Sequence, residues 1–478
     1  MEGSRPKVVI VGGGMGGLSA AKALRKKDVD VLVVDRTNYQ GFWPFLYQVA
    51  TSQLEEEPIA YPIRGLIRRH PNVDFHMGEV RTVDFARKRV VTDNDEIPYD
   101  YLILAAGSET NFFGNDEMAR HAYGLKDVEQ ADRLRNHLLS VFEQAARERD
   151  AERRAALLTF IIVGGGPTGC ELSGALAQLI NAPLSKDFPT LELRKESHVV
   201  LVQGADTLLP PFPEKLRNYA KARLEKLGVE VRLNTIVKSV DGGIVTFSDG
   251  SQTAATTVVW AAGVRAADVI GTLGVELGSL GRVKVTETLN LADNPEVFAI
   301  GDVMHLDGYK GADGGPYPML AQVAIQGGKQ AAHNVLAAVE GKSLKPFKYF
   351  DKGMMAIIGR GAAIVDAFGV KMSGFFAFLG WLGLHIFYLR GFRNRVVVLI
   401  DWFADYIRSN QGVRIITRPE LADHVQEVHE RVLDHRRRTM TGIQALPPEL
   451  VAQAAEQAAA EQAAAEQAAP EQAAPEPR

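Results

Sequence analysis

Two glycine-rich turns in one chain constrain its fold more than any other feature. The first is VGGGMGGLSAAKAL at 11–24 and the second is VGGGPTGCELSGAL at 163–176. Each follows an aliphatic run and precedes a helical pattern, which is typical of a dinucleotide-binding β-α-β unit. Each unit closes with a predicted buried strand ending in Ala-Ala-Gly, 95 residues after Gly12 and 99 residues after Gly164. This matched spacing predicts an α/β protein with two doubly wound Rossmann-type domains, the second inserted into the first.

The first turn has the residues that a pyrophosphate site needs. Gly12, Gly14 and Gly17 let the backbone approach the phosphates at a helix N-terminus, where free N–H groups and the helix dipole favour negative charge. Asp35 ends the next predicted strand, where it can accept hydrogen bonds from an adenosine ribose. A glycine-rich turn without a ligand is the alternative, but the strand, helix and acid in register favour dinucleotide binding.

The second turn differs at one position. Gly164, Gly166 and Gly169 repeat the pattern, but Gln203 occupies the place that Asp35 has in the first unit. A carboxylate there binds a ribose 2′-hydroxyl and repels a 2′-phosphate, whereas a glutamine binds the hydroxyl more weakly and does not repel the phosphate. No arginine adjoins Gln203 in the sequence, so we expect NADH, with NADPH as a second candidate. Two nucleotides in one chain are typical of a flavin that exchanges electrons with a nicotinamide, which predicts FAD at the first turn.

Further stretches resemble the type II NADH dehydrogenases, the non-proton-pumping NADH:quinone oxidoreductases among the two-dinucleotide flavoprotein reductases. The resemblance covers about residues 5–418. The stretches that carry it are FWPFLYQVATSQL (42–54), beside the flavin in that family; EVFAIGD (296–302), its second flavin motif; AQVAIQGG (321–328), its quinone-site motif; FDKGMMAIIGRGAAIV (350–365); and GFFAFLGWLGLHIFYLRGFRNR (374–395), its membrane-docking segment. The resemblance implies FAD as cofactor, NADH as donor, a membrane quinone as acceptor, and a role in respiratory electron transport.

The resemblance also implies site residues. Asp302 would bond the ribityl chain of FAD, and Ala321, Gln322 and Ile325 would form the wall of the quinone pocket. The residues implied for FAD are Gly12, Gly14, Gly16, Gly17, Asp35, Arg36, Gln48, Thr51, Val80, Ala106, Gly107, Asp302, Ala321 and Gln322. Those implied for the nicotinamide nucleotide are Gly164, Gly166, Gly169, Gln203 and Gly263.

Four residues are candidates for the chemistry: Glu171, Gln322, Ile325 and Lys371. Glu171 lies in the first turn of a predicted helix, where the dipole stabilises a carboxylate. The resemblance implies that Glu171 faces the flavin and delivers protons to the quinone, while a purely stabilising helix-start acid stays open. Ordinary helix packing is the alternative for Gln322 and Ile325. Lys371 is either a positive charge at the quinone mouth or an interfacial lysine.

The C-terminal region decides between a membrane and a soluble acceptor. Residues 372–389 contain 18 positions without a formal charge. A helix of that length spans about 27 Å, less than the hydrocarbon core of about 30 Å. The segment 371–418 contains seven basic and two acidic residues, and aromatic residues are frequent in it. This composition favours amphipathic helices docked on an anionic leaflet, with a buried core helix second and a single membrane span third.

The patterns divide the chain into five segments. They are a first FAD-binding segment (residues 1–125), an NAD(P)H-binding domain (126–270), a second FAD-binding segment with the quinone-site helix (271–370), a membrane-association region (371–418), and a charged helix with a low-complexity Ala/Glu/Gln tail (419–478). The tail lacks an apolar stripe, so we expect it to be solvated.

Composition excludes several functions. The single cysteine, Cys170, rules out a disulfide framework, a Cys-based metal cluster and a dithiol, which removes sulfide:quinone and disulfide reductases; no metal is expected. A net charge of −4 argues against nucleic-acid binding. With no visible signal peptide, we expect peripheral attachment to the cytoplasmic face of the membrane, and the family implies a homodimer. The alternatives are a soluble NAD(P)H-dependent reductase of ferredoxin or another acceptor, and a non-enzymatic NADH sensor.

Overall fold

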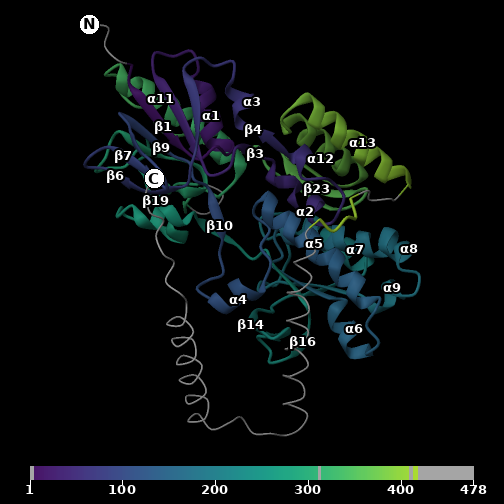
Figure 1. Cartoon of the computed structure of the whole chain (residues 1–478). Helices are drawn as coiled ribbons and strands as arrows, with labels where there is room; N and C mark the ends of the chain where they lie inside the picture. Colours follow the sequence, from purple (N-terminus) through teal and green to yellow (C-terminus); the bar gives the residue numbers. More distant parts are fainter. Residues whose placement is uncertain (1–4, 310–313, 409–412, 418–478) are drawn as a thin grey trace, which may run out of the picture.

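The larger of two multi-stranded parallel sheets is built from two separate regions of the chain (Figure 1). The computed structural model describes residues 5–309, 314–408 and 413–417. In the order β20-β9-β1-β2-β5, this sheet contains β20 (Val297–Ala299), β9 (Tyr101–Leu104), β1 (Lys7–Val11), β2 (Asp30–Asp35) and β5 (Val73–Met77). All its neighbouring strands run parallel. Because β20 follows the second unit in the chain, that unit is an insertion, as the sequence predicted.

The second sheet repeats this arrangement. Its order is β13-β12-β11-β17, with β13 (Val229–Arg232), β12 (His198–Val202), β11 (Thr159–Val163) and β17 (Thr257–Trp260). The two glycine turns start identically, since Gly12 N donates to Val34 O and Gly164 N donates to Val202 O, both at 2.8 Å. The central strands are buried on both faces, which explains their continuous aliphatic runs.

Three long helices position the turns. α1 (Met15–Leu24) and α7 (Pro167–Leu179) each begin directly after a glycine turn, and α11 (Ala321–Val339) packs along α1. The α1–α11 contact is very close, because a Cβ atom on Gly328 would lie 2.3 Å from the carbonyl oxygen of Gly16. These glycines therefore bring the predicted quinone-motif helix against the helix of the first turn.

The C-terminal region forms an antiparallel sheet followed by two helices. The sheet contains β22 (Met354–Gly359), β23 (Ala362–Ala367) and β24 (Val370–Gly374), and the helices are α12 (Phe375–Tyr388) and α13 (Phe392–Arg408). The sequence predicted one apolar helix from residue 372, but the backbone stays extended until Gly374, whose φ of 89° ends the strand. Among the described helices, none has the length and apolar character needed to cross a bilayer.

α12 and α13 lie side by side at one edge of the molecule (Figure 1). Ala377, Phe378 and Trp381 of α12 are buried in the main core, while Phe376 is 76% and Phe387 70% exposed. One face of this helix pair therefore packs into the core of the protein, and the opposite, outer face exposes apolar side chains.

Further helices and strands complete the described fold. The remaining α-helices are α2 (Leu46–Ala50), α3 (Ile63–Ile67), α4 (Asp116–His121), α5 (Val128–Ala145), α6 (Ala151–Leu157), α8 (Ser185–Asp187), α9 (Leu193–Glu196) and α10 (Glu214–Lys226). The remaining strands are β3 (Tyr39–Gly41), β4 (Ala60–Pro62), β6 (Val80–Asp84), β7 (Arg89–Thr92), β8 (Glu96–Pro98), β10 (Ser108–Thr110), β14 (Val237–Asp241), β15 (Ile244–Phe247), β16 (Gln252–Ala254), β18 (Val264–Ala266), β19 (Val283–Lys284) and β21 (Met304–His305). The predicted charged helix and tail, 419–478, lie outside the described residues.

Candidate active site

The glycines of the first turn serve two different purposes. Gly12 has a φ of 106°, and a Cβ atom on Gly17 would lie 1.9 Å from the carbonyl oxygen of Gly12, so the turn itself requires both glycines. Gly14 has an ordinary φ of −74°, and a Cβ atom there would meet nothing within 4 Å. The fold thus leaves open space at Gly14, directly before the α1 N-terminus, where a pyrophosphate would approach.

A groove of about 900 Å³ extends from this turn, within the range of small-molecule and cofactor sites. Asp35 Oδ2 accepts a hydrogen bond from Gly13 N at 2.5 Å. Asp302 also lines the groove; it accepts from Ser108 Oγ at 2.5 Å and lies 3.7 Å from Lys126 Nζ. The predicted FAD residues that line the groove are Gly12, Gly14, Asp35, Arg36, Ala106, Gly107 and Asp302.

Some groove residues were not identified from the sequence. Gln40, Trp43, Lys126 and Arg265 also line the groove. Trp43 lies in the FWPFLYQVATSQL stretch but was not singled out there, and the other three belong to none of the motifs recognised in the sequence. Lys126 could have been found only by its place beside Asp302, which the fold creates. Their amide, indole and cationic groups suit the polar regions of a dinucleotide.

Other predicted FAD residues lie outside the groove. Thr51 is buried and donates to Tyr47 O at 2.7 Å, and both polar ends of the buried Gln48 side chain bind protein partners. Val80 lies in β6. The predicted FAD residues on helices α1 and α11 also lie outside the groove; they are Gly16, Gly17, Ala321 and Gln322.

The second turn repeats the geometry of the first. Gly164 has a φ of 113°, and a Cβ atom on Gly169 would lie 1.9 Å from Gly164 O, while one on Gly166 would meet nothing within 4 Å. Gln203 Oε1 accepts from Gly165 N at 3.0 Å, which is the role that Asp35 has in the first unit. Gly263, at the end of the second unit, has a φ of 158°.

An arginine that the sequence did not place beside Gln203 lies on the neighbouring strand. Gln203 N donates to Arg232 O at 2.8 Å, because Arg232 ends the strand that pairs with β12. The Arg232 guanidinium binds Glu230 at 2.6 Å and lies over the ring of Phe247. The fold thus brings the Arg232 backbone next to Gln203, while the guanidinium group pairs with Glu230.

Glu171 lines a second cavity, of about 470 Å³. Its side chain is partly buried, and Ile357 N donates to Oε1 at 3.4 Å. Burial raises the pKa of Glu171 to about 8, while the Ile357 hydrogen bond lowers it by a smaller amount. Glu171 is therefore largely protonated at neutral pH and can donate a proton.

This cavity opens at the apolar outer face of α12 and α13. Phe375, Leu379, Leu399 and Phe403 line it, and each is also substantially exposed on the protein surface. An apolar ligand can therefore reach the Glu171 cavity from the side of these helices.

The other three candidates for the chemistry do not line the Glu171 cavity. Gln322 and Ile325 lie in the first two turns of α11, where Gln322 Oε1 is buried and has no hydrogen-bond partner among the described residues. Lys371 is exposed in β24. Of the four predicted residues, only Glu171 therefore lines this cavity.

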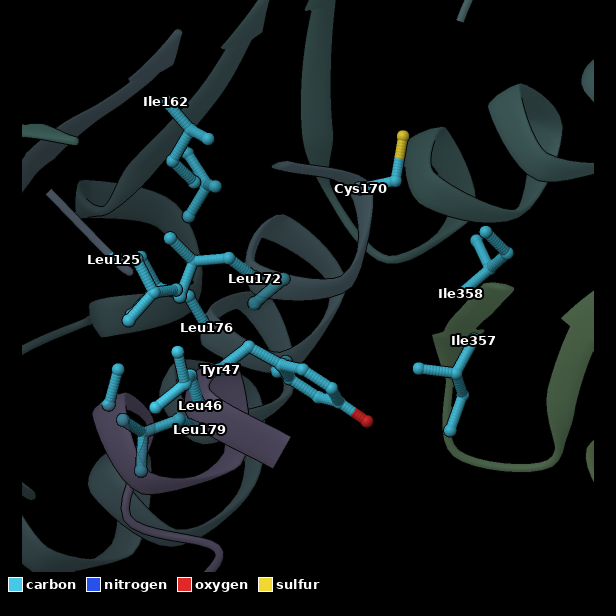
Figure 2. Packing of buried hydrophobic residues seen from close by; sticks show 14 of the residues in the cluster. Leu46, Tyr47, Leu125, Ile162, Cys170, Leu172, Leu176, Leu179, Ile357 and Ile358 are labelled. Atoms are coloured by element: carbon cyan, nitrogen blue, oxygen red, sulfur yellow. The ribbon is translucent and has the colours of Figure 1, made fainter. Parts of the chain in front are cut away.

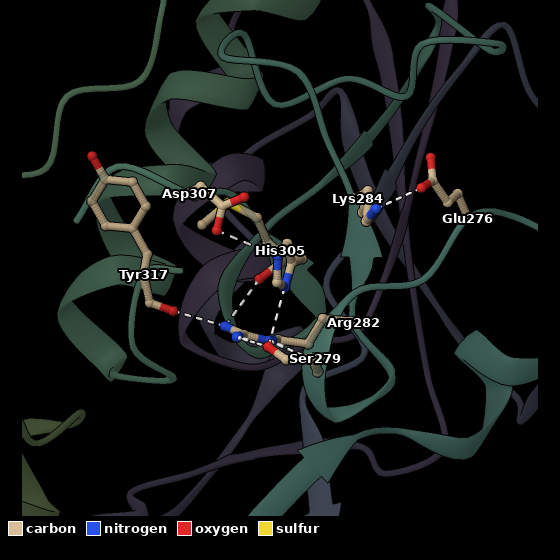
Figure 3. A network of polar contacts seen from close by, with 8 residues as sticks. Glu276, Ser279, Arg282, Lys284, His305, Asp307 and Tyr317 are labelled. Carbon is tan, nitrogen blue, oxygen red and sulfur yellow. Dashed lines mark hydrogen bonds and ion pairs between the residues drawn. The ribbon is translucent and has the colours of Figure 1, made fainter. Parts of the chain in front are cut away.

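A buried arginine holds the segment between Asp302 and α11 (Figure 3). The Arg282 side chain donates to Tyr317 O at 2.8 Å, to Ser279 Oγ at 2.8 Å and to Met304 O at 3.4 Å. Because Met304 closely follows the Asp302 turn and Tyr317 precedes α11, Arg282 fixes both elements relative to each other.

Comparison with known proteins defines the family. Residues 6–328 match the family described as pyridine nucleotide-disulphide oxidoreductase. A type II NADH:quinone oxidoreductase of Mycobacterium tuberculosis is 41% identical over 428 residues, which cover 86% of this chain and 90% of that protein. The chain belongs to the type II NADH:quinone oxidoreductases. A member of this family from Haemophilus influenzae is 29% identical, and the match covers 84% of this chain and 98% of that protein.

A solved structure supports the fold of this type II family member. NDH2 from Plasmodium falciparum in complex with NADH matches with a TM-score of 0.78 at 20% identity, covering 87% of this chain and 100% of that one. The predicted family and fold class are confirmed. The name of the broader family refers to disulphide chemistry, whereas this sequence contains a single cysteine, Cys170.

Proposed function

We propose that this chain is a membrane-associated flavoenzyme that passes electrons from NADH through FAD to a membrane quinone without pumping protons. In this proposal residues 1–125 and 271–370 hold FAD, 126–270 holds the nicotinamide nucleotide and 371–418 meets the lipid. Membership of the type II NADH:quinone oxidoreductases supports the reaction. The residues described above supply binding, orientation and proton donation.

The first groove fits FAD. Open space at Gly14, the Asp35 carboxylate and the Asp302–Lys126 pair suit the pyrophosphate, the ribose and the ribityl chain, in that order. When bound, FAD would supply two-electron transfer between the nicotinamide and the quinone. The protein contributes the N-terminus of α1, which favours the negative phosphates, and polar side chains along the groove.

Gln203 supports NADH as the donor, with NADPH accepted less well. Its Oε1 atom already accepts from Gly165 N, so one acceptor lone pair remains for a ribose 2′-hydroxyl. Glu230 pairs with Arg232 and limits the attraction of that arginine for a 2′-phosphate.

The Glu171 cavity is the observation that carries the quinone assignment. It joins a partly buried carboxyl group with a raised pKa to an apolar opening on the outer face of the molecule. A long-tailed quinone stays in the bilayer, so its reductase must present the site at the lipid surface. Glu171 is placed to supply the proton that a reduced quinone oxygen needs.

The outer face of α12 and α13 supports peripheral docking. Phe376, Phe387 and Phe392 are 76%, 70% and 83% exposed, and Arg393 and Lys371 are exposed in the same region of the chain. Aromatic and basic side chains together suit the headgroup region of an anionic leaflet. We place this leaflet at the cytoplasmic face of the membrane and propose a homodimer, which light scattering of the purified protein would test.

Anaerobic stopped flow on the FAD-loaded protein in anionic vesicles tests the function. NADH should bleach the flavin faster than NADPH, and vesicle menaquinone or ubiquinone should restore the colour at a rate that accounts for turnover. Absence of flavin reoxidation by both quinones would contradict the proposal, and fast reoxidation by a ferredoxin instead would support the soluble reductase. Slow reoxidation by every acceptor would support an NADH sensor.

A further inference from the structure

Three side chains link the outer helix α13 to the Glu171 cavity. Trp402 Nε1 of α13 donates to Gln48 Oε1 at 2.9 Å, and Gln48 Nε2 donates to the Tyr47 hydroxyl at 2.7 Å. Gln48 and Tyr47 belong to α2 and are both buried. Trp402, Tyr47 and Glu171 all line the same cavity.

The chemistry of these groups fixes the direction of each hydrogen bond. An indole N–H can only donate, so the Gln48 oxygen must face Trp402, and the Gln48 amide NH₂ must then face Tyr47. The Tyr47 oxygen is therefore an acceptor toward Gln48, and its own proton has to point elsewhere. Among the hydrogen bonds of the described residues, the Tyr47 hydroxyl donates none.

The free proton of Tyr47 is directed toward the cavity. Figure 2 shows the Tyr47 ring beside the leucine side chains of α7, with its hydroxyl oxygen turned away from them and toward Ile357. Ile357 is also the residue whose backbone N–H binds Glu171, and it lines the cavity. Burial and the nearby Glu171 raise the pKa of Tyr47 well above its usual value, so the hydroxyl keeps its proton at every working pH.

Building on the proposed quinone reductase activity, we propose that Tyr47 is a catalytic hydrogen-bond donor to a carbonyl oxygen of the quinone in this cavity, and that Gln48 and Trp402 are positioning residues that keep its proton aimed at the substrate. Tyr47 retains its proton throughout. Its hydrogen bond strengthens as negative charge develops on the quinone oxygen, while the proton itself comes from Glu171 or water.

This arrangement gives α13 a role beyond docking. If the indole N–H of Trp402 is removed, the Gln48 amide can rotate and present its oxygen to Tyr47 instead. Tyr47 would then donate to Gln48 and lose its free proton. The catalytic orientation of Tyr47 therefore depends on one N–H group of the outer helix.

Single-turnover kinetics with a short-tailed ubiquinone in detergent test the proposal without involving lipid docking. We expect Tyr47→Phe to slow quinone-dependent flavin reoxidation by about 100- to 1,000-fold, the range for loss of one donor to a developing oxyanion, and to leave flavin reduction by NADH unchanged. Tyr219→Phe removes the hydroxyl of a tyrosine outside the cavity and serves as the matched control; both half-reactions should stay at wild-type rates.

A double-mutant cycle tests the positioning residues. Trp402→Phe keeps an aromatic ring and should slow reoxidation several-fold in the wild-type background, but it should have no further effect in Tyr47→Phe. If the double variant is slowed by the product of the two single-variant factors, Trp402 does not act through Tyr47, and its positioning role is overturned. A Tyr47→Phe protein that is reoxidised at the wild-type rate, or that is slowed equally in both half-reactions, would overturn the role of Tyr47. A wild-type protein that no quinone reoxidises would contradict the proposed function itself.

Discussion

Glu171 is the residue whose ionisation should control the rate of quinone reduction. Its pKa is raised to about 8, above its value in an unfolded chain, so the protonated donor predominates below pH 8 and is lost above it. We expect quinone-dependent flavin reoxidation to be flat below pH 8 and to fall about tenfold per pH unit well above it.

Glu171→Gln should remove that pH dependence. Glutamine can still accept from Ile357 N but cannot transfer a proton, so reoxidation should be about 100-fold slower or more and show no break near pH 8. Stopped flow from pH 6 to 10 measures this, and the rate of flavin reduction by NADH serves as the internal control. A break near pH 8 in the Gln variant would assign the ionisation to another group.

His385 should make the docking helices sensitive to acid. It is partly buried, stacks on Trp381 with ring centroids 4.1 Å apart, and hydrogen-bonds to Trp381 O at 2.7 Å. Burial lowers its pKa to about 4, below the usual 6.5. The unfolded chain therefore binds a proton first, and this contribution to stability is lost as the pH falls from about 6.5 to about 4, by about 1.4 kcal/mol for each unit of pKa difference.

The comparison of wild type with His385→Phe isolates this effect. Phenylalanine keeps an aromatic ring against Trp381 and does not titrate, so the variant should lose less thermal stability than wild type between pH 7 and pH 5. Taking the difference between the two proteins at each pH cancels the other titrating groups, including Glu171, whose raised pKa acts in the opposite direction. If wild type and His385→Phe lose the same thermal stability between pH 7 and pH 5, the prediction is contradicted.

At the scale of elements, the glycines of the first turn separate folding from binding. Gly17→Ala forces a Cβ atom to 1.9 Å from Gly12 O and should lower the free energy of unfolding by about 2–4 kcal/mol. At Gly14 there is room for a methyl group and the φ is ordinary. Gly14→Ala should therefore lower the free energy of unfolding by no more than about 1 kcal/mol, because alanine is a poorer N-cap than glycine. Gly14→Ala should nevertheless weaken FAD binding, because its methyl group occupies the space of the pyrophosphate.

Urea unfolding of the FAD-free proteins and fluorescence titration with FAD measure the two quantities separately. Gly166→Ala, the equivalent change in the second turn, serves as the matched control, since it should impair reduction by NADH and leave FAD affinity unchanged. Wild-type FAD affinity in Gly14→Ala would show that the pyrophosphate does not approach this turn.

The elements that sequence predicted best are those defined by local chemistry. The two turns and Asp35 could be found because each strand, turn and helix is contiguous in the chain. The Glu171 cavity could not, because Tyr47, Glu171, Ile357 and Trp402 come together only through tertiary packing. The end of strand β24 was predicted as helix because the apolar run begins within it, and only the positive φ of Gly374 marks the change.

At the scale of the whole molecule, the docking helices are anchored to the body of the protein. The Asn394 side chain donates to Pro58 O at 2.9 Å, and Trp402 binds Gln48 at the same distance. Beyond α13, Thr417 N donates to Asn136 Oδ1 at 2.7 Å. Deleting the helices would expose the core around Trp381, which is 1% exposed, so surface substitutions are the appropriate test of docking.

Phe376→Gln/Phe387→Gln should separate lipid docking from chemistry. Both side chains are more than two-thirds exposed and neither lines the Glu171 cavity. Losing two lipid-buried phenylalanines, at about 1.5–3 kcal/mol each, should weaken binding to anionic vesicles by about 100-fold or more. Turnover with a long-tailed quinone in vesicles should fall accordingly, while turnover with a short-tailed quinone in detergent should stay at the wild-type rate.

Met77→Gln/Leu277→Gln removes two exposed apolar side chains outside α12 and α13 and provides the control for general changes in hydrophobicity. Co-sedimentation with vesicles at low and high salt completes the measurement, because screening should weaken the share of binding that comes from Arg393 and the other basic residues. If the control pair loses as much vesicle binding as the Phe376/Phe387 pair, the lipid contact is not localised to these helices. If the Phe376/Phe387 pair binds vesicles as wild type does, the outer face of α12 and α13 is not the membrane surface of this enzyme.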